Sequence, residues 1–289
     1  MPRVALATAS KYPALTDDDR LLLTPLAQRS IQAELTIWND PSRKWSSYDA
    51  VVVRSCWDYH LQPENFLRWI ANLEALNVPL FNSADVIRWN ANKTYLRDLE
   101  AKGIAVVPTL WPEHGERVSL DDALREMAWP KAVVKPRISA TAYRTQLVTP
   151  QDVISAQALF DDLRRGPGVM VQKFMDGVAN EGEWSLMFFG GAFSHAVIKR
   201  PKPGDFRVQN DFGGTAQPAD PPPHVLAAAT QVVESVDATL YARVDGVVDE
   251  GRFRLMELEL IEPALFLSEH HAAPARFAEA IGQVLKTTV

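Results

Sequence analysis

The sequence has 289 residues, is 47% hydrophobic and 23% charged, and carries a formal net charge of -6. A chain of this length and composition is expected to form a globular protein with a large core, distributed over two or three lobes. Its net charge is negative, so it has no excess of positive charge that would attract nucleic acid. No apolar run approaches the roughly 20 residues that span a bilayer. We therefore expect small-molecule partners, with no nucleic acid and no membrane.

The cysteine content and the first residues of the sequence indicate in which cellular compartment the protein is expected. Cys56 is the single cysteine, which excludes an internal disulfide and is compatible with a reducing environment. Residues 1–7 have the pattern of a first strand and not of a secretory signal, because the apolar stretch is short and polar residues follow it. We expect a cytoplasmic protein.

Strand and helix patterns alternate through the first part of the chain, which predicts an α/β fold. The predicted parts form a small open parallel sheet, and ligands bind such sheets at the carboxyl ends of their strands. Segment 54–59 follows one strand directly and is a candidate substrate loop. Strands are expected over 4–8, 35–38, 50–53 and 78–81, and helices from Thr16 and over 64–76.

The rest of the chain mixes helices with antiparallel strand signals. A turn at 165–168 separates a helix from a strand, and Gly190-Gly191 is placed to join a hairpin. Helices are expected over 152–165, from the prolines at 221–223 to about 236, and over 274–286, and strands over 132–135, 169–172, 184–189 and 192–199.

A hairpin near the C-terminus collects three carboxylates. Glu257 and Glu259 are two residues apart on one strand and project to the same face, and the turn at 249–251 can bring Asp245 beside them. Magnesium prefers hard oxygen ligands and often lies between carboxylates and substrate phosphates. The alternative is an acidic solvent face, against which Arg243 argues because a phosphate site uses a guanidinium as well as carboxylates.

Two lysines and one acid upstream are placed for a nucleotide. Lys135 ends a buried strand before a proline, and Lys93 opens a predicted helix, so either could reach a phosphate. Glu183 begins a strand after the segment 172–175, where backbone groups could bind adenine and the acid could accept from ribose hydroxyls. Taken alone, the lysines read as exposed solubilising side chains and Glu183 as a solvated strand end.

The segment 199–214 concentrates cations, amides and paired glycines. Glycines let backbone N–H groups approach phosphate oxygens, and arginines neutralise the charge that develops in phosphoryl transfer. The segment is either a loop that closes over an anion or a flexible basic surface loop.

In this order the residues resemble those of the ATP-grasp superfamily, with the closest likeness to bacterial glutathione synthetase-like members, over essentially the whole chain. The most specific parts are 204–214 and 256–263. The segment 54–59 also resembles a branch that includes the cyclo-ligase of the cycloserine pathway. The resemblance implies an N-terminal α/β domain over 1–84 and two α+β lobes that clasp ATP, a central one over 85–170 and a C-terminal one over 171–289.

The resemblance also implies roles for individual residues. Glu259 is usually an asparagine in glutathione synthetases, so this site is more anionic, which should tighten binding of magnesium or manganese and argues against glutathione as the product. A homodimer is expected by analogy alone. The implied ATP-binding residues are Lys93, Lys135, Gln172, Lys173, Phe174, Met175, Glu183 and Lys199; the ligands of two Mg2+ or Mn2+ ions are Asp245, Glu257 and Glu259; the catalytic residues are Arg207, Arg243, Asn210, Gly213 and Gly214; and the substrate contacts are Arg54, Ser55, Trp57 and Asp58.

The implied activity is that of a carboxylate–amine ligase. In this superfamily ATP phosphorylates a carboxylate and an amine displaces phosphate from the acyl phosphate, which leaves ADP and an amide. Ring closure within one substrate and ligation of two substrates both fit the residues. A nucleotide-binding protein without catalysis and a kinase are the remaining alternatives.

Overall fold

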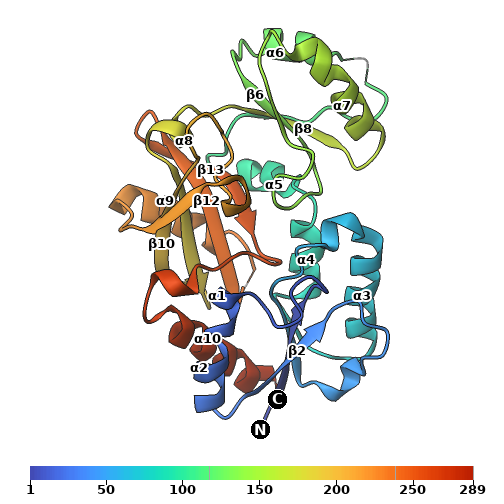
Figure 1. The fold of residues 1–289 in the computed structure, drawn as a ribbon, viewed down its shortest axis with the longest axis vertical. Helices are drawn as coiled ribbons and strands as arrows, with labels where there is room; N and C mark the ends of the chain where they lie inside the picture. The colour runs from blue at the N-terminus through green and yellow to red at the C-terminus, as the bar shows by residue number, and fades with distance from the viewer. Residues whose placement is uncertain (117, 238, 289) are drawn as a thin grey trace.

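The computed structural model describes residues 1–116, 118–237 and 239–288, which form three sheets with helices packed around them (Figure 1). Each sheet is built from one continuous part of the chain, and the C-terminal helix returns to the N-terminal part. Within the described residues, no helix is long and apolar enough to cross a membrane.

The N-terminal sheet is parallel throughout, with strand order β2-β1-β3-β4, which confirms the predicted open parallel sheet. Helix α3 carries Phe66, Trp69, Ile70 and Leu73 on one buried face, because these residues recur every three or four positions. The elements are β1 (Arg3–Thr8), α1 (Asp17–Arg20), α2 (Leu23–Gln28), β2 (Gln32–Ile37), β3 (Ala50–Val53), α3 (Pro63–Ala75), β4 (Leu80–Phe81) and α4 (Ala84–Asn90).

The middle part carries a small antiparallel sheet of order β5-β8-β6-β7, covered by α6 and α7. The predicted lobe boundary at residue 170 falls inside β8 (Val169–Lys173), and the division into 1–84, 85–170 and 171–289 stays a prediction. The elements are α5 (Tyr95–Ala101), β5 (Thr109–Leu110), α6 (Leu120–Glu126), β6 (Ala132–Pro136), β7 (Gln146–Val148), α7 (Val153–Arg165) and β8 (Val169–Lys173).

The C-terminal sheet is antiparallel, with strand order β11-β10-β9-β12-β13. Both predicted hairpins are present, one between β9 and β10 and one between β12 and β13. The elements are α8 (Gly177–Asn180), β9 (Glu183–Phe189), β10 (Ala192–Arg200), a 3-10 turn over Asn210–Phe212, β11 (Thr215–Pro218), α9 (Pro223–Glu234), β12 (Tyr241–Asp249), β13 (Arg252–Glu259) and α10 (Ala273–Thr288).

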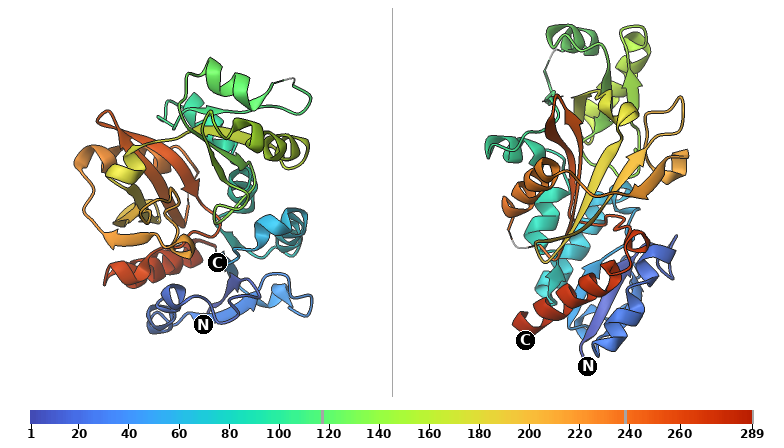
Figure 2. Two further views of the ribbon diagram at one scale, coloured as in Figure 1. Left: turned by 45° about the horizontal axis from the view of Figure 1, so that its top comes forward. Right: turned by 90° about the vertical axis from the view of Figure 1, so that its left-hand side faces the viewer.

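Helices cover both faces of the C-terminal sheet, so its central strand is buried on both sides. Successive side chains of β9 point to opposite faces: Leu186 and Phe188 lie in the cluster that includes α9, and Met187 and Phe189 in the one that includes α10. The α10 cluster also contains residues of β1 and α2, so the last helix joins the C-terminal sheet to the N-terminal part (Figure 2). This packing fixes the N-terminal loops relative to the C-terminal sheet.

Candidate active site

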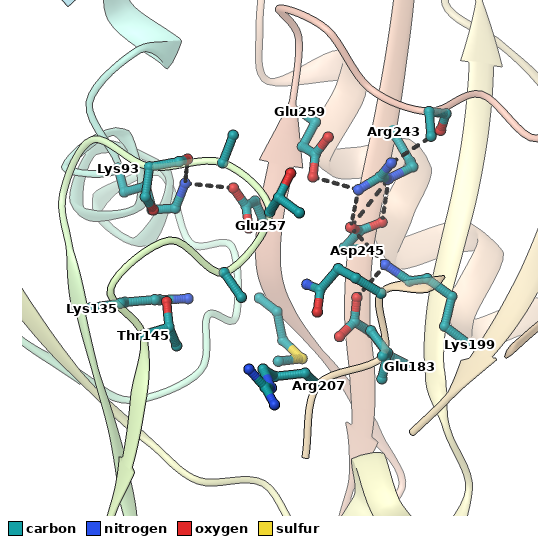
Figure 3. Close-up of a pocket in the computed structure, with 18 of the residues that line it drawn as sticks. Lys93, Lys135, Thr145, Glu183, Lys199, Arg207, Arg243, Asp245, Glu257 and Glu259 are labelled. Atoms are coloured by element: carbon teal, nitrogen blue, oxygen red, sulfur yellow. Dashed lines mark hydrogen bonds and ion pairs between the residues drawn. The ribbon is translucent and has the colours of Figure 1, made fainter. Parts of the chain in front are cut away.

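A cavity of about 420 Å³ is lined by residues from all three parts of the chain. Figure 3 shows Lys93 and Lys135 on one side and the strands that carry Glu183, Lys199 and Asp245 on the other. Eleven of the predicted site residues line this cavity, and they are Trp57, Lys93, Lys135, Gln172, Glu183, Lys199, Arg207, Arg243, Asp245, Glu257 and Glu259.

The β12–β13 hairpin pairs the charged residues directly. Asp245 lies opposite Glu257 and Arg243 lies opposite Glu259, and the register shifts by a bulge just after Asp245. Gly246 follows the shift, and a Cβ there would lie 2.5 Å from the carbonyl oxygen of Arg254. The bulge therefore requires glycine, and it interrupts the regular pairing next to the acidic residues before the strands pair again in shifted register.

Arg243 holds the acidic residues together. Its guanidinium donates to both oxygens of Asp245, at 3.0 Å and 2.9 Å, and to the carbonyl oxygen of Ala264 at 3.0 Å. It also pairs with the carboxylate of Glu259 (Figure 3). Burial raises the pKa of Glu259 to about 7, and the negative charges of Glu257 and Asp245 contribute to this increase. The positive charge of Arg243 lowers the pKa but offsets only part of the increase.

Lys199 bridges two acids on neighbouring strands. Its Nζ lies 2.5 Å from Oε1 of Glu183 and 3.1 Å from Oδ2 of Asp245, whose other oxygen accepts from the hydroxyl of Ser185 at 2.6 Å. Burial alone would raise the pKa of Asp245, but Arg243 and Lys199 outweigh it and lower the pKa to about 2. Asp245 is therefore ionised at neutral pH.

The two predicted phosphate lysines differ in their surroundings. Nζ of Lys93 lies 2.7 Å from Oε1 of Glu257 and 3.0 Å from the carbonyl oxygen of Ser139. Nζ of Lys135 donates to Oε1 of Gln172 at 3.0 Å and forms no ion pair with any carboxylate in the described parts of the chain. Burial lowers the pKa of Lys135, so an anion in the cavity would find a poorly compensated cation there.

The segment 172–175 only partly reaches the cavity. Gln172 lines it, while Met175 packs in a separate apolar cluster with Val107 and Val247. The backbone N–H of Lys173 and of Phe174 is already used in hydrogen bonds to neighbouring segments. Among the described residues of this segment, Gln172 lines the cavity, and Lys173, Phe174 and Met175 do not.

The loop that follows β10 brings Arg207 to the cavity. Asp205 accepts two hydrogen bonds from the guanidinium of Arg207, at 3.0 Å and 2.9 Å, and this guanidinium lies 3.7 Å from the ring centroid of Phe212. Gly214 lines a neighbouring cavity, and a Cβ there would lie 2.1 Å from the carbonyl oxygen of Val208. Gly213 is in neither of these linings, and the side chain of Asn210 lies outside the described part of the structure.

The predicted substrate loop divides into one cavity residue and three residues with partners elsewhere. Trp57 lines the cavity, whereas Arg54 is 1% exposed and donates to Asp19 at 2.9 Å and to the carbonyl oxygen of Pro263 at 2.8 Å. Ser55 also donates to Asp19, and Asp58 accepts from the indole of Trp38. The cavity lining, as far as the chain is described, omits Arg54, Ser55 and Asp58.

Polar residues that were not predicted from the sequence also line the cavity, among them part of one loop and one further acid. The loop 139–145 contributes Ser139, Thr141 and Thr145, and it contains left-handed residues without a glycine to signal them. Glu262 also lines the cavity. It lies within the distinctive run 256–263, so its position in that run was the available signal.

The acidic residues fit magnesium by the chemistry of their oxygens. Asp245, Glu257 and Glu259 present carboxylates from paired strands, which is the donor type that magnesium prefers. Within the described residues, no three histidine, cysteine or acidic side chains already converge as a metal site. Each of the three carboxylates instead contacts Lys93, Lys199 or Arg243, and these cations supply the positive charge that a metal ion would supply.

Comparisons with known proteins show the family of the chain. Residues 4–82 match the family described as the N-terminal domain of D-cycloserine synthetase DcsG. The cycloserine biosynthesis protein DcsG of Streptomyces lavendulae is 30% identical over 98% of this chain and 99% of its own length. The chain belongs to the DcsG family.

Solved structures extend the relationship to the whole fold. The crystal structure of D-cycloserine synthetase DcsG has a TM-score of 0.88 at 28% identity, covering 98% of this chain and 99% of that one. D-Alanine–D-alanine ligase from Bacillus anthracis, solved with ATP, has a TM-score of 0.70 at 15% identity, covering 100% of this chain and 97% of that one. The RimK domain protein ATP-grasp from Sphaerobacter thermophilus has a TM-score of 0.72 at 18% identity, covering 97% of this chain and 99% of that one. The predicted ATP-grasp fold is confirmed, as is the predicted class of ATP-dependent ligase.

Proposed function

We propose that this protein is an ATP- and magnesium-dependent carboxylate–amine ligase that works through an acyl phosphate. The observation that carries the proposal is one cavity with the incompletely compensated Lys135 on one wall and the acidic hairpin of Asp245, Glu257 and Glu259 on the other. Such a cavity can hold the triphosphate of ATP between cations and metal-bound carboxylates.

The nucleotide would lie along the residues that face the cavity. Lys93 and Lys135 would bind phosphate oxygens, with Gln172 of the segment 172–175 beside adenine and Glu183 accepting from ribose. Lys199 would hold Glu183 in place, since the two already form an ion pair. Arg207 would cover the transferring phosphoryl group from the loop side.

The acidic hairpin would bind magnesium, in our proposal two ions. Bound magnesium would neutralise charge on the phosphates. Arg243 would orient Asp245 and Glu259 from behind, because its contacts to both side chains and to Ala264 are already in place. This makes Arg243 a positioning residue for the metal ligands.

The chemistry then follows from charge and position. A carboxylate oxygen of the substrate attacks the terminal phosphorus of ATP, and ADP leaves. The amine attacks the carbonyl carbon of the acyl phosphate, phosphate leaves, and the amine loses a proton. The products are an amide, ADP and phosphate.

A cytoplasmic location and a homodimer stay predictions.

Ring closure within one substrate is the second candidate, and the match to DcsG over nearly the full length of both chains favours it. Carboxylate and amine would then belong to one amino acid, and the product would be a cyclic amide. Trp57, which lines the cavity from the N-terminal domain, is a contact for either substrate arrangement.

A single assay separates these possibilities. The protein is incubated with ATP, magnesium and a panel of amino acids and small carboxylic acids, with the carboxylates labelled by heavy oxygen. We expect ADP and phosphate, with one labelled oxygen transferred to the phosphate. Formation of AMP and pyrophosphate would refute the acyl phosphate. Dependence on one reactant, with a product lighter by one water, would identify ring closure.

A further inference from the structure

Glu262 differs from the other acidic residues of the cavity because its carboxylate has no partner. The residue follows β13 and lines the cavity. Among the described residues, no side chain or backbone group forms a hydrogen bond or ion pair with the Glu262 carboxylate. By contrast, Glu183 pairs with Lys199, Glu257 with Lys93, and Glu259 with Arg243.

The backbone around Glu262 is firmly held by the N-terminal domain. The indole N–H of Trp57 donates to the carbonyl oxygen of Glu262 at 2.8 Å, and Arg54 donates to that of the next residue, Pro263. Trp57 itself lines the cavity. Glu262 therefore lies where the N-terminal domain meets the cavity, beyond the residues of β13 that face Lys93 and Arg243.

The surroundings of Glu262 leave negative charge uncompensated. Burial raises the pKa of Glu262 well above its ordinary value, and the nearby charge of Glu259 raises it further. Lys93 and Arg243 act in the opposite direction from a distance, but both are engaged with other carboxylates. A cation from outside the chain would relieve this imbalance.

A substrate ammonium group fits this position better than a metal ion. Magnesium requires several oxygen ligands at close to octahedral geometry, and the acidic hairpin offers them, whereas Glu262 stands apart on the substrate-loop side. An ammonium group needs one carboxylate and neighbouring acceptors. We propose that Glu262 binds the ammonium group of an amino-acid substrate, an inference that rests on the proposed ligase function and specifies its substrate class.

The test measures thermal stabilisation of the full chain by matched compounds, with magnesium and a nonhydrolysable ATP analogue present. Each pair differs by one amino group: D- and L-alanine against propionate, D- and L-serine against hydroxypropionate, and D-cycloserine against isoxazolidinone. We expect the wild-type chain to prefer the amine-bearing member of at least one pair. Glu262→Gln should lower the affinity for that member about 10- to 100-fold, the effect of losing one charge-assisted hydrogen bond.

The matched control is Glu279→Gln, which makes the same change at an exposed position on α10 and should leave all affinities unchanged. Affinity of Glu262→Gln for the ATP analogue should also be unchanged. If the glutamine variant does not fold, Glu262→Asp keeps the charge on a shorter side chain and should weaken binding while retaining the preference for amines.

Three outcomes would overturn the inference. In the first, the wild-type chain binds no amine-bearing member more tightly than its partner compound. In the second, Glu262→Gln loses affinity equally for both members of a pair. In the third, Glu262→Gln loses affinity for magnesium or the ATP analogue alone. Because binding is measured without turnover, a failure of the ligase proposal shows separately, as absence of ADP in the preceding assay.

Discussion

Replacing Glu257 by glutamine separates catalysis from folding at this site. Nζ of Lys93 has two acceptors, Oε1 of Glu257 at 2.7 Å and the carbonyl oxygen of Ser139 at 3.0 Å. The amide oxygen of glutamine can replace the first, so the variant loses only the difference between a charge-assisted and a neutral hydrogen bond. That difference is about 1–2 kcal/mol, which lowers Tm by a few degrees in a chain of this size.

The expected effect on turnover is much larger. Burial alone would raise the pKa of Glu257, but Lys93 and Lys135 outweigh it and keep the carboxylate ionised. Losing this charge leaves magnesium with a neutral amide oxygen in place of a carboxylate, and loss of one electrostatic contact to a transition state costs about a hundredfold or more in rate.

The measurement is ADP release by Glu257→Gln over a range of magnesium concentrations, with thermal melts of the same preparations. Glu250→Gln, in the exposed turn of the same hairpin, is the control and should behave as wild type. Unchanged turnover in Glu257→Gln at limiting magnesium would remove Glu257 from the metal ligands. A large fall in Tm would instead show that Lys93 depends on the carboxylate for folding.

Two further predictions concern residues that support the site. Asp19→Ala leaves buried Arg54 without its carboxylate and should lower the free energy of unfolding, measured in urea, by about 3–5 kcal/mol. Asp17→Ala on the same helix, at a side chain 93% exposed, is the control and should lower it little. Equal effects of the two changes would argue against a structural role for Arg54. His195 is neutral in the fold, since burial lowers its pKa and hydrogen bonds to the carbonyl oxygens of Leu265 and Phe266 offset only part of this. The unfolded chain therefore binds one proton more than the folded chain, and stability is lost as pH falls below about 6.5. In His195→Gln, the urea midpoint should fall less steeply between about pH 7.5 and 5 than it does in the wild-type chain. An equal dependence of the midpoint on pH in both chains would refute this prediction.

Local patterns were sufficient to predict most elements that carry the site. The spacing of apolar residues in α3 and the position of the turn between β12 and β13 depend on neighbours in the chain, so both could be predicted. The pairing of Asp245 with Glu257 follows from the same turn. By contrast, β2 begins at Gln32, three residues before the predicted start, because pairing with β1 continues beyond the apolar stretch.

Side-chain partners from distant segments could not be predicted in this way. The sequence placed Arg54 after a strand end, where a ligand contact is a reasonable expectation, but the fold brings α1 and Pro263 against it. Similarly, the loop 139–145 lacks glycine, so its left-handed residues Thr141 and Ala142 gave no signal. These features depend on which surfaces meet, and that information lies in contacts across the whole chain.

Glu259 shows how a distant partner changes the meaning of a local difference. From the sequence, a carboxylate in place of the usual asparagine predicts tighter metal binding. In the structure, Arg243 lies opposite Glu259 in the strand register and pairs with it, while the same guanidinium holds Asp245. Part of the added negative charge is therefore neutralised inside the protein before any metal binds. The extra carboxylate is better understood as fixing Arg243, and through it Asp245, than as a simple increase in attraction for magnesium.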